Sequence, residues 1–309
     1  MFMLIKPNTK FDFMRTRFIW MGLSIVLVTA SLILFFTKGL NYGVDFTGGI
    51  EMNVKFNDAA VDTQKVREVV KKVKVEDIQV QKFSDVEKNE YLIRVKSTKE
   101  DLGALTKDIE ANLKAGFPEG SYEVRKVDVV GPRVGEELKL SGIYSLIYAM
   151  LGIFIYVFIR FDYKFSVGAI VALLHDPIII VGVFALTGYQ FTLSTVAALL
   201  TVIGYSVNDT IVVYDRIRET MGTQKGSSYY DIINKSVNET LSRTILTSAV
   251  TMLVVAMLLI FGGATLWDFS LALTIGIVIG TYSSIFVASP VVLYLEDLAK
   301  KRAEAKAAR

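Results

Sequence analysis

The sequence predicts a polytopic α-helical membrane protein of six transmembrane helices with an inserted α+β domain. Hydrophobic residues make up 52% of the 309 residues, charged residues make up 21%, and the mean hydropathy is +0.44. Soluble chains carry more charge than this, so the average combines a very apolar region with an ordinary one. The apolar residues form six long stretches, whereas residues 38–139 have the composition of a soluble domain.

Each of the six apolar stretches is long enough to cross a bilayer, which takes about 20 residues. We expect transmembrane helices at 18–36, 140–159, 165–187, 191–213, 244–261 and 269–295. The first stretch follows Arg15 and Arg17 and has a longer apolar run than the core of a signal peptide. We therefore interpret it as a retained anchor.

The distribution of positive charge predicts the topology. Outside residues 38–139 the chain has 16 Lys and Arg, and with six crossings all of them fall on one side of the membrane. The positive-inside rule makes that side cytoplasmic. We expect 1–17 and 296–309 to be cytoplasmic and 37–139 to be extracytoplasmic, because so long a loop is translocated largely regardless of its charge.

The extracytoplasmic segment has the pattern of two βαβ-like halves. Alternating residues predict strands at 49–56, 78–83, 90–96 and 122–130, with a polar turn at 84–89. Helical periodicity predicts helices at 62–73 and at 98–113, the second capped by Thr98. The order β-α-β-β-α-β is that of a ferredoxin-like domain. Its titratable residues form no cluster that resembles an enzyme site.

The loop 214–243, between the fourth and fifth spans, is long and amphipathic. Tyr229, Ile233, Val237 and Leu241 share one helical stripe. We expect a helix that lies along the cytoplasmic surface of the membrane lipid.

Asp209 is an ionisable residue inside the fourth span, about five residues before its cytoplasmic end. Such a residue is costly in a bilayer and indicates a functional site by default. Tyr205 and Ser206 lie one turn earlier and Asn208 adjoins it, which predicts a polar shell. The functional interpretation is a carboxylate that binds and releases a cation; the structural one is an anchoring pair with a neighbouring helix.

Arg243 is the natural partner of Asp209, because it opens the fifth span at a similar depth. Thr247 lies one turn deeper on the same helical face. The alternative is an arginine that extends to the lipid interface without touching Asp209.

Asp176 lies near the middle of the third span, between His175 and Pro177. A proline inside a helix removes one backbone hydrogen bond and frees a carbonyl. We interpret Asp176 as a second relay carboxylate or part of a hinge. The alternative is a structural kink, in which neighbouring helices supply hydrogen-bond partners for the freed polar groups.

The sixth span has a stripe of small residues that predicts close helix packing: Ala272, Gly276, Gly280, Ser284 and Ala288.

Composition excludes several other classes of protein. The chain has no cysteine and one histidine, which excludes a Cys nucleophile and a site of several histidines for a metal. A formal charge of +3 does not indicate nucleic-acid binding. The pair Asp176 and Asp209 lacks the local motifs of an intramembrane aspartyl protease.

The chain resembles the SecF branch of the SecD/SecF family in the RND superfamily. Five motifs carry the resemblance and run in family order from the first exported residues to the last span: GVDFTGG at 43–49, LLHDP at 173–177, GYSVNDTIVVYDRIRE at 204–219, NETLSRTILTS at 238–248 and GTYSSIFVASP at 280–290. The short exported region fits this branch better than SecD.

The resemblance implies half of an RND-type bundle in the bacterial inner membrane, with a periplasmic domain. It implies an accessory subunit rather than an enzyme, which pairs with SecD beside the SecYEG channel and acts on a translocating unfolded polypeptide. It implies no cofactor besides the transported H⁺ or Na⁺. In this family the carboxylate at the position of Asp209 couples the ion and the arginine at Arg243 is implicated with it, while Asp176 matches a family motif.

Glycines and a proline flank the exported domain. Because these residue types suit hinges or tight turns, we expect one or the other role for the following positions: Gly43, Gly48, Gly49, Gly131, Pro132 and Gly135.

Two other functions compete with ion-driven export. In a passive scaffold, Asp209 and Arg243 would be a structural ion pair. A small-molecule RND exporter is disfavoured, because only one half of such a transporter is present and the exported domain is small.

Overall fold

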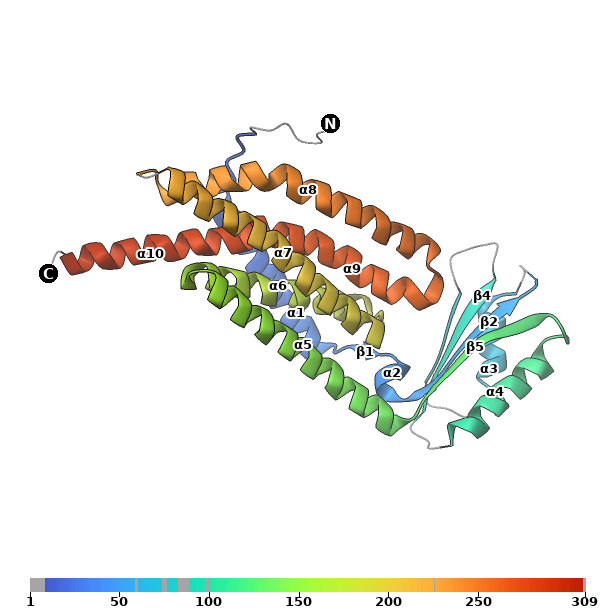
Figure 1. Cartoon of the computed structure of the whole chain (residues 1–309). Helices are drawn as coiled ribbons and strands as arrows, with labels where there is room; N and C mark the ends of the chain where they lie inside the picture. The colour runs from blue at the N-terminus through green and yellow to red at the C-terminus, as the bar shows by residue number, and fades with distance from the viewer. Residues whose placement is uncertain are drawn as a thin grey trace.

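The computed structural model describes residues 9–58, 61–73, 77–82, 89–97, 101–224 and 226–307. Figure 1 shows a bundle of long helices with a small sheet domain at one end, which we call the sheet end of the bundle. The sheet domain is inserted after the first long helix. The predicted fold class, six membrane helices with an inserted α+β domain, is confirmed.

Six helices of the described residues are long and apolar enough to cross a membrane. They are α1 (Arg17–Thr37), α5 (Pro132–Arg160), α6 (Tyr163–Thr187), α7 (Leu193–Thr223), α8 (Tyr229–Phe261) and a last helix that joins α9 (Gly263–Ser283), the π-helical η1 (Ser284–Ala288) and α10 (Ser289–Ala307). The most apolar stretch is 56% buried in α6, α7 and the last helix but 11% buried in α1, α5 and α8. Helices α6, α7 and the last helix therefore form the centre of this multi-pass membrane protein.

Local sequence signals set several helix ends. Thr192 and Thr195 form a capping box at the start of α7, where the Thr195 backbone NH donates to Thr192 Oγ1 at 3.3 Å. Gly188 ends α6 with a φ of 73°, in the left-handed region that glycine favours. Pro132 occupies the first turn of α5, where its missing NH costs nothing.

The predicted interfacial helix in the loop 214–243 is wrong. Helix α7 continues to Thr223, and α8 begins at Tyr229 and runs directly into its apolar part. The stripe of Ile233, Val237 and Leu241 is buried in the bundle core. An amphipathic stripe has the same sequence pattern on a helix that packs against protein as on one that rests on lipid, so the pattern alone did not separate the two.

The sheet domain consists of β2 (Gly49–Phe56), α3 (Thr63–Val70), β3 (Asp77–Lys82), β4 (Glu90–Lys96), α4 (Leu102–Gly116) and β5 (Tyr122–Val130). The strands pair antiparallel in the order β3-β4-β2-β5, as the β-α-β-β-α-β pattern requires. Helices α3 and α4 cover one face of this sheet (Figure 1). Three predicted features lie outside the described residues: the strand end at 83, most of the turn 84–89 and the cap Thr98. Helix α4 is capped by Asp101, which accepts from Ala104 N at 3.0 Å.

The chain enters and leaves the sheet domain through one tightly packed junction. Strand β1 (Asn41–Tyr42) pairs in parallel with β6 (Gln190–Phe191), and the short helix α2 (Val44–Thr47) packs against the start of α5. Asp45 accepts from Leu193 N at 2.9 Å, which fixes α2 to the start of α7. None of these junction elements was predicted from the sequence.

Glycines allow the backbone segments of this junction to approach. Gly49 has a φ of 141°, and a Cβ there would lie 2.2 Å from the Val95 carbonyl oxygen. A Cβ on Gly48 would lie 2.7 Å from Pro132 Cα, and one on Gly135 would lie 3.0 Å from Gly48 N. Gly131 differs, since its φ is −65° and nothing lies within 4 Å of a Cβ. The geometry favours tight turns over hinges at Gly48 and Gly49, while a hinge role elsewhere stays a prediction.

Gly49→Ala is expected to destabilise the protein by about 3 kcal/mol or more, because it combines a strained φ with a backbone clash. The measurement is thermal unfolding of the purified chain in detergent. Gly131→Ala is the matched control and is expected to cost about 1 kcal/mol at most, because alanine is a poorer N-cap than glycine but meets no neighbour there. Equal melting temperatures for the two variants would contradict the tight-turn assignment.

An ionic contact between Arg94 and Asp268 joins the sheet domain to the bundle beside this junction. Arg94 of β4 bonds Glu51 of β2 through its Nε at 2.6 Å, and its Nη2 lies 3.5 Å from an Asp268 carboxylate oxygen. Asp268 lies near the start of α9, and both Arg94 and Asp268 are buried. The contact therefore ties the sheet to a central helix of the bundle.

Asp268→Asn is expected to widen the distribution of distances between the sheet domain and the bundle, because it removes the charge that holds Arg94. The chain has no native cysteine, so spin labels on cysteines at Lys107 and Leu186 can report that distance. Glu90→Gln removes an ion pair inside the sheet domain, Arg125 to Glu90 at 2.7 Å, and should leave the distribution unchanged. Equal widths for all three proteins would refute a restraining role for Asp268.

Candidate functional site

The candidate site is a pair of carboxylates buried between the central helices. Asp176 of α6 is 0% exposed and Asp209 of α7 is 8% exposed. Buried charges are costly unless they are paired or hydrogen-bonded. The partners of each carboxylate therefore decide what it can do.

Asp176 is fully enclosed by three polar side chains. Its Oδ1 lies 2.8 Å from His175 Nδ1. Its Oδ2 accepts from Ser206 Oγ at 2.5 Å and from Ser283 Oγ at 2.9 Å. These partners come from α6, α7 and α9, so Asp176 connects the three central helices.

Asp209 is held by two hydroxyl groups, one from α8 and one from the last helix. Thr244 of α8 donates to Oδ1 at 2.6 Å, and Ser284 of η1 donates to Oδ2 at 2.5 Å. No Lys or Arg nitrogen of the described residues lies within 4.0 Å of this carboxylate. Because a hydroxyl can donate or accept, this shell can hold a carboxylate or a protonated carboxyl group.

The last helix supplies one donor to each carboxylate, and α7 carries both Asp209 and a donor to Asp176. Ser206 and Asp209 are three residues apart on one face of α7, and Ser283 and Ser284 are consecutive on the last helix. A π-helical segment begins at Ser284, whose carbonyl accepts from Ser289 Oγ at 3.0 Å. Such segments occur frequently at functional sites.

Small residues bring the last helix close enough to supply these donors. A Cβ on Gly276 would lie 2.1 Å from Val202 Cγ2, and one on Gly280 would lie 3.1 Å from Ser206 Cβ. The small-residue stripe of the sixth span therefore packs against α7 and places Ser283 and Ser284 beside the carboxylates.

None of the four residues of the predicted polar shell hydrogen-bonds Asp209. Ser206 serves Asp176 instead, and Tyr205 bonds Ser248 at 3.1 Å. Asn208 and Thr247 are exposed on the outside of the bundle. Each step along a helix turns by about 100°, so residues next to Asp209 in sequence point away from its partners.

Arg243 does not pair with Asp209 within 4.0 Å; its side chain is exposed, and the residue after it, Thr244, makes the contact. Sequence reasoning missed Thr244 and Ser283 and placed Ser284 only in the packing stripe. The sequence signal for these donors was the run of hydroxyl residues at 281–284.

Among the described residues, no group of three or more His, Cys, Asp or Glu could hold a metal ion.

A bundle of membrane helices that encloses Asp176 and Asp209 between its central helices, with an inserted α+β domain at one end, defines a multi-pass membrane transport protein. A family model described as protein export membrane protein SecD/SecF, C-terminal, matches residues 109–298, and one for the SecD/SecF GG motif matches 33–60. The chain belongs to the SecD/SecF family.

Similar proteins place the chain on the SecF side of this family. The protein translocase subunit SecF of Calditerrivibrio nitroreducens is 45% identical over 96% of this chain and 98% of its own length. That of Rhodothermus marinus is 42% identical over 99% of this chain and 100% of its own length. The predicted resemblance is confirmed, and the chain is a SecF-type subunit of protein translocase.

Solved structures show the same fold within a longer chain. The crystal structure of SecDF, a translocon-associated membrane protein from Thermus thermophilus, has a TM-score of 0.81 and 34% identity over 94% of this chain. SecDF in a super-membrane-facing form has a TM-score of 0.72 and 32% identity over 99% of this chain. This chain covers 39% and 41% of those two SecDF chains.

Proposed function

We propose that this chain pairs with SecD and uses the proton or sodium gradient to promote a late stage of protein translocation through the SecYEG channel. One observation carries the proposal: Asp209 is buried among membrane helices and has hydroxyl partners, while no Lys or Arg nitrogen of the described residues lies within 4.0 Å of it. A carboxylate so placed is costly, and in membrane proteins such residues mark ion and proton pathways.

The chemistry of the shell suits an ion that comes and goes. Thr244 and Ser284 come from different helices, so binding or loss of a cation at Asp209 changes what holds α8 and η1 to α7. One elementary charge that crosses 100 mV releases about 2.3 kcal/mol. Arg243 remains a proposed participant because it adjoins Thr244.

The proposed location is the bacterial inner membrane, with both termini cytoplasmic and the sheet domain periplasmic. The 16 Lys and Arg outside residues 38–139 support this orientation. No cofactor besides the transported ion is required.

A passive scaffold is the second candidate, and Asp176 is the observation that favours it. Its carboxylate oxygens are bonded to His175, Ser206 and Ser283 in a closed network, as in a structural anchor. The two functions differ in one measurable property, which is dependence on the ion gradient.

The test uses inverted membrane vesicles from cells with and without the chain, loaded with a translocation intermediate whose ATP-driven step is complete. We expect the chain to speed completion only while a proton or sodium gradient is present. Selective collapse of each gradient by an uncoupler or a sodium ionophore identifies the ion. Stimulation that persists without either gradient would establish the scaffold instead.

A further inference from the structure

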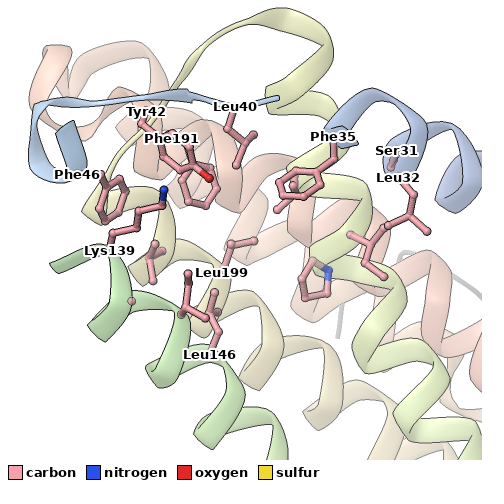
Figure 2. Close-up of a pocket in the computed structure, with 16 residues that line it drawn as sticks. Ser31, Leu32, Phe35, Leu40, Tyr42, Phe46, Lys139, Leu146, Phe191 and Leu199 are labelled. Atoms are coloured by element: carbon pink, nitrogen blue, oxygen red, sulfur yellow. The ribbon is translucent and has the colours of Figure 1, made fainter. Parts of the chain in front are cut away.

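We propose that the groove between α1 and α5 at the sheet end of the bundle binds one phospholipid, with an acyl chain in its apolar pocket and the phosphate at Lys139. The pocket has a volume of about 330 Å³. Figure 2 shows that Leu40, Tyr42 and Phe46 close its top, while Leu146 and Leu199 lie below. This proposal is independent of ion coupling at Asp209.

The pocket opens sideways, toward the surface that the membrane covers. Leu32 of α1 and Ile143 of α5 line it from opposite sides, and their side chains are 40% and 46% exposed. Helix α6 contributes Pro177 and Val181 to the lining. A lipid can therefore reach the pocket from the bilayer without passing through water.

Lys139 is the one charged residue among the described residues that line the pocket. Its Nζ lies 4.4 Å from the centroid of the Tyr42 ring (Figure 2). No carboxylate of the described residues lies within 4.0 Å of that nitrogen; the nearby Glu137 pairs with Arg133 at 3.6 Å. The ammonium group thus has an aromatic neighbour and remains available to an anion.

The position of Lys139 matches the depth of a lipid headgroup. The apolar part of α5 begins at the next residue, and α1 ends at Thr37, just past the pocket residue Phe35. A lysine at the end of a membrane helix reaches the interface, where lipid phosphates lie.

The lining also selects against a polypeptide. A peptide segment in an apolar pocket needs partners for each backbone NH and C=O group, and this lining offers almost none. A helix about 10 Å wide does not fit a pocket of this volume. An acyl chain has no polar groups to satisfy, and it is narrow and flexible.

The test places the full chain in nanodiscs with a phosphatidylglycerol that carries a photoreactive diazirine in its acyl chain. We expect adducts on peptides of α5 and α6 that line the pocket. Gly142→Leu fills the pocket, since a Cβ there meets Val196 at an ordinary 3.6 Å, and should remove these adducts. Gly152→Leu, on the same helix with nothing within 4 Å, is the matched control and should keep them.

Lys139→Glu tests the headgroup contact without touching the apolar lining. We expect the apparent affinity for phosphatidylglycerol, measured by native mass spectrometry, to fall about tenfold, as for loss of one charge-assisted contact. Adducts of equal yield in the wild type, Gly142→Leu and Lys139→Glu would overturn the proposal in favour of unspecific surrounding lipid. A photoreactive residue at Ile143 that captures a translocating polypeptide or a partner helix would assign the groove to that occupant instead.

Discussion

Asp209→Asn is expected to reduce export of a secreted reporter to the level of cells that lack the chain, while the proposed complex with SecD still forms. The amide has the shape of the carboxylate, so it can still accept from Thr244, and Ser284 can accept from its NH₂ group. It cannot gain or lose a proton, so it cannot use the free energy of about 2.3 kcal/mol that one charge releases across 100 mV. That free energy corresponds to a roughly fifty-fold shift in a two-state equilibrium.

Asp215→Asn is the matched control on the same helix. Asp215 lies two turns nearer the end of α7 and forms an exposed ion pair with Arg160 at 3.0 Å. Exposed pairs contribute little to stability, so export should stay normal. Normal export with Asp209→Asn and an intact complex would remove the ion-site assignment, and loss of the complex would support the scaffold.

Asp176→Ala is expected to lower the stability of the whole bundle by about 3 kcal/mol or more. The change removes the shared partner of His175, Ser206 and Ser283; Ser283 can still donate to the Gly280 carbonyl oxygen, but each group left unpaired costs about 1–3 kcal/mol. The measurement is thermal unfolding of the purified chain, together with the amount of protein in the membrane.

Asp176→Asn separates structure from ion coupling at this position. Its amide oxygen can still accept from Ser206 and Ser283 and its NH₂ group can donate to His175, so most of the stability should return. Normal export with Asp176→Asn would make the residue a structural anchor. Poor export from a stable protein would place Asp176 in the ion pathway.

The large features of the fold were predictable because they depend on long sequence patterns. Six apolar runs set the membrane helices, and alternation with two helical segments set the sheet domain. The junction was not predictable, since β1 and β6 are only two residues each and their pairing joins Asn41 to Gln190 across the sequence.

The site was predictable in its carboxylates but not in its shell. An aspartate in an apolar helix is conspicuous by itself, whereas its donors depend on which helix faces it. Thr244 instead of Arg243 meets Asp209 because of the rotation of α8, and the serines reach the site through the packing at Gly276 and Gly280. Helix rotation leaves little trace in the sequence of a helix that is apolar on most faces.

The junction at Gly48, Gly49 and Pro132 has a mechanical consequence. Because β5 ends at Val130 and α5 begins at Pro132, a single residue, Gly131, separates the sheet from α5. Helix α5 has 29 residues and is therefore about 43 Å long. A tilt of about 10° around its far end would displace the sheet domain by about 7 Å at this length, so a small rearrangement inside the membrane becomes a large excursion outside it.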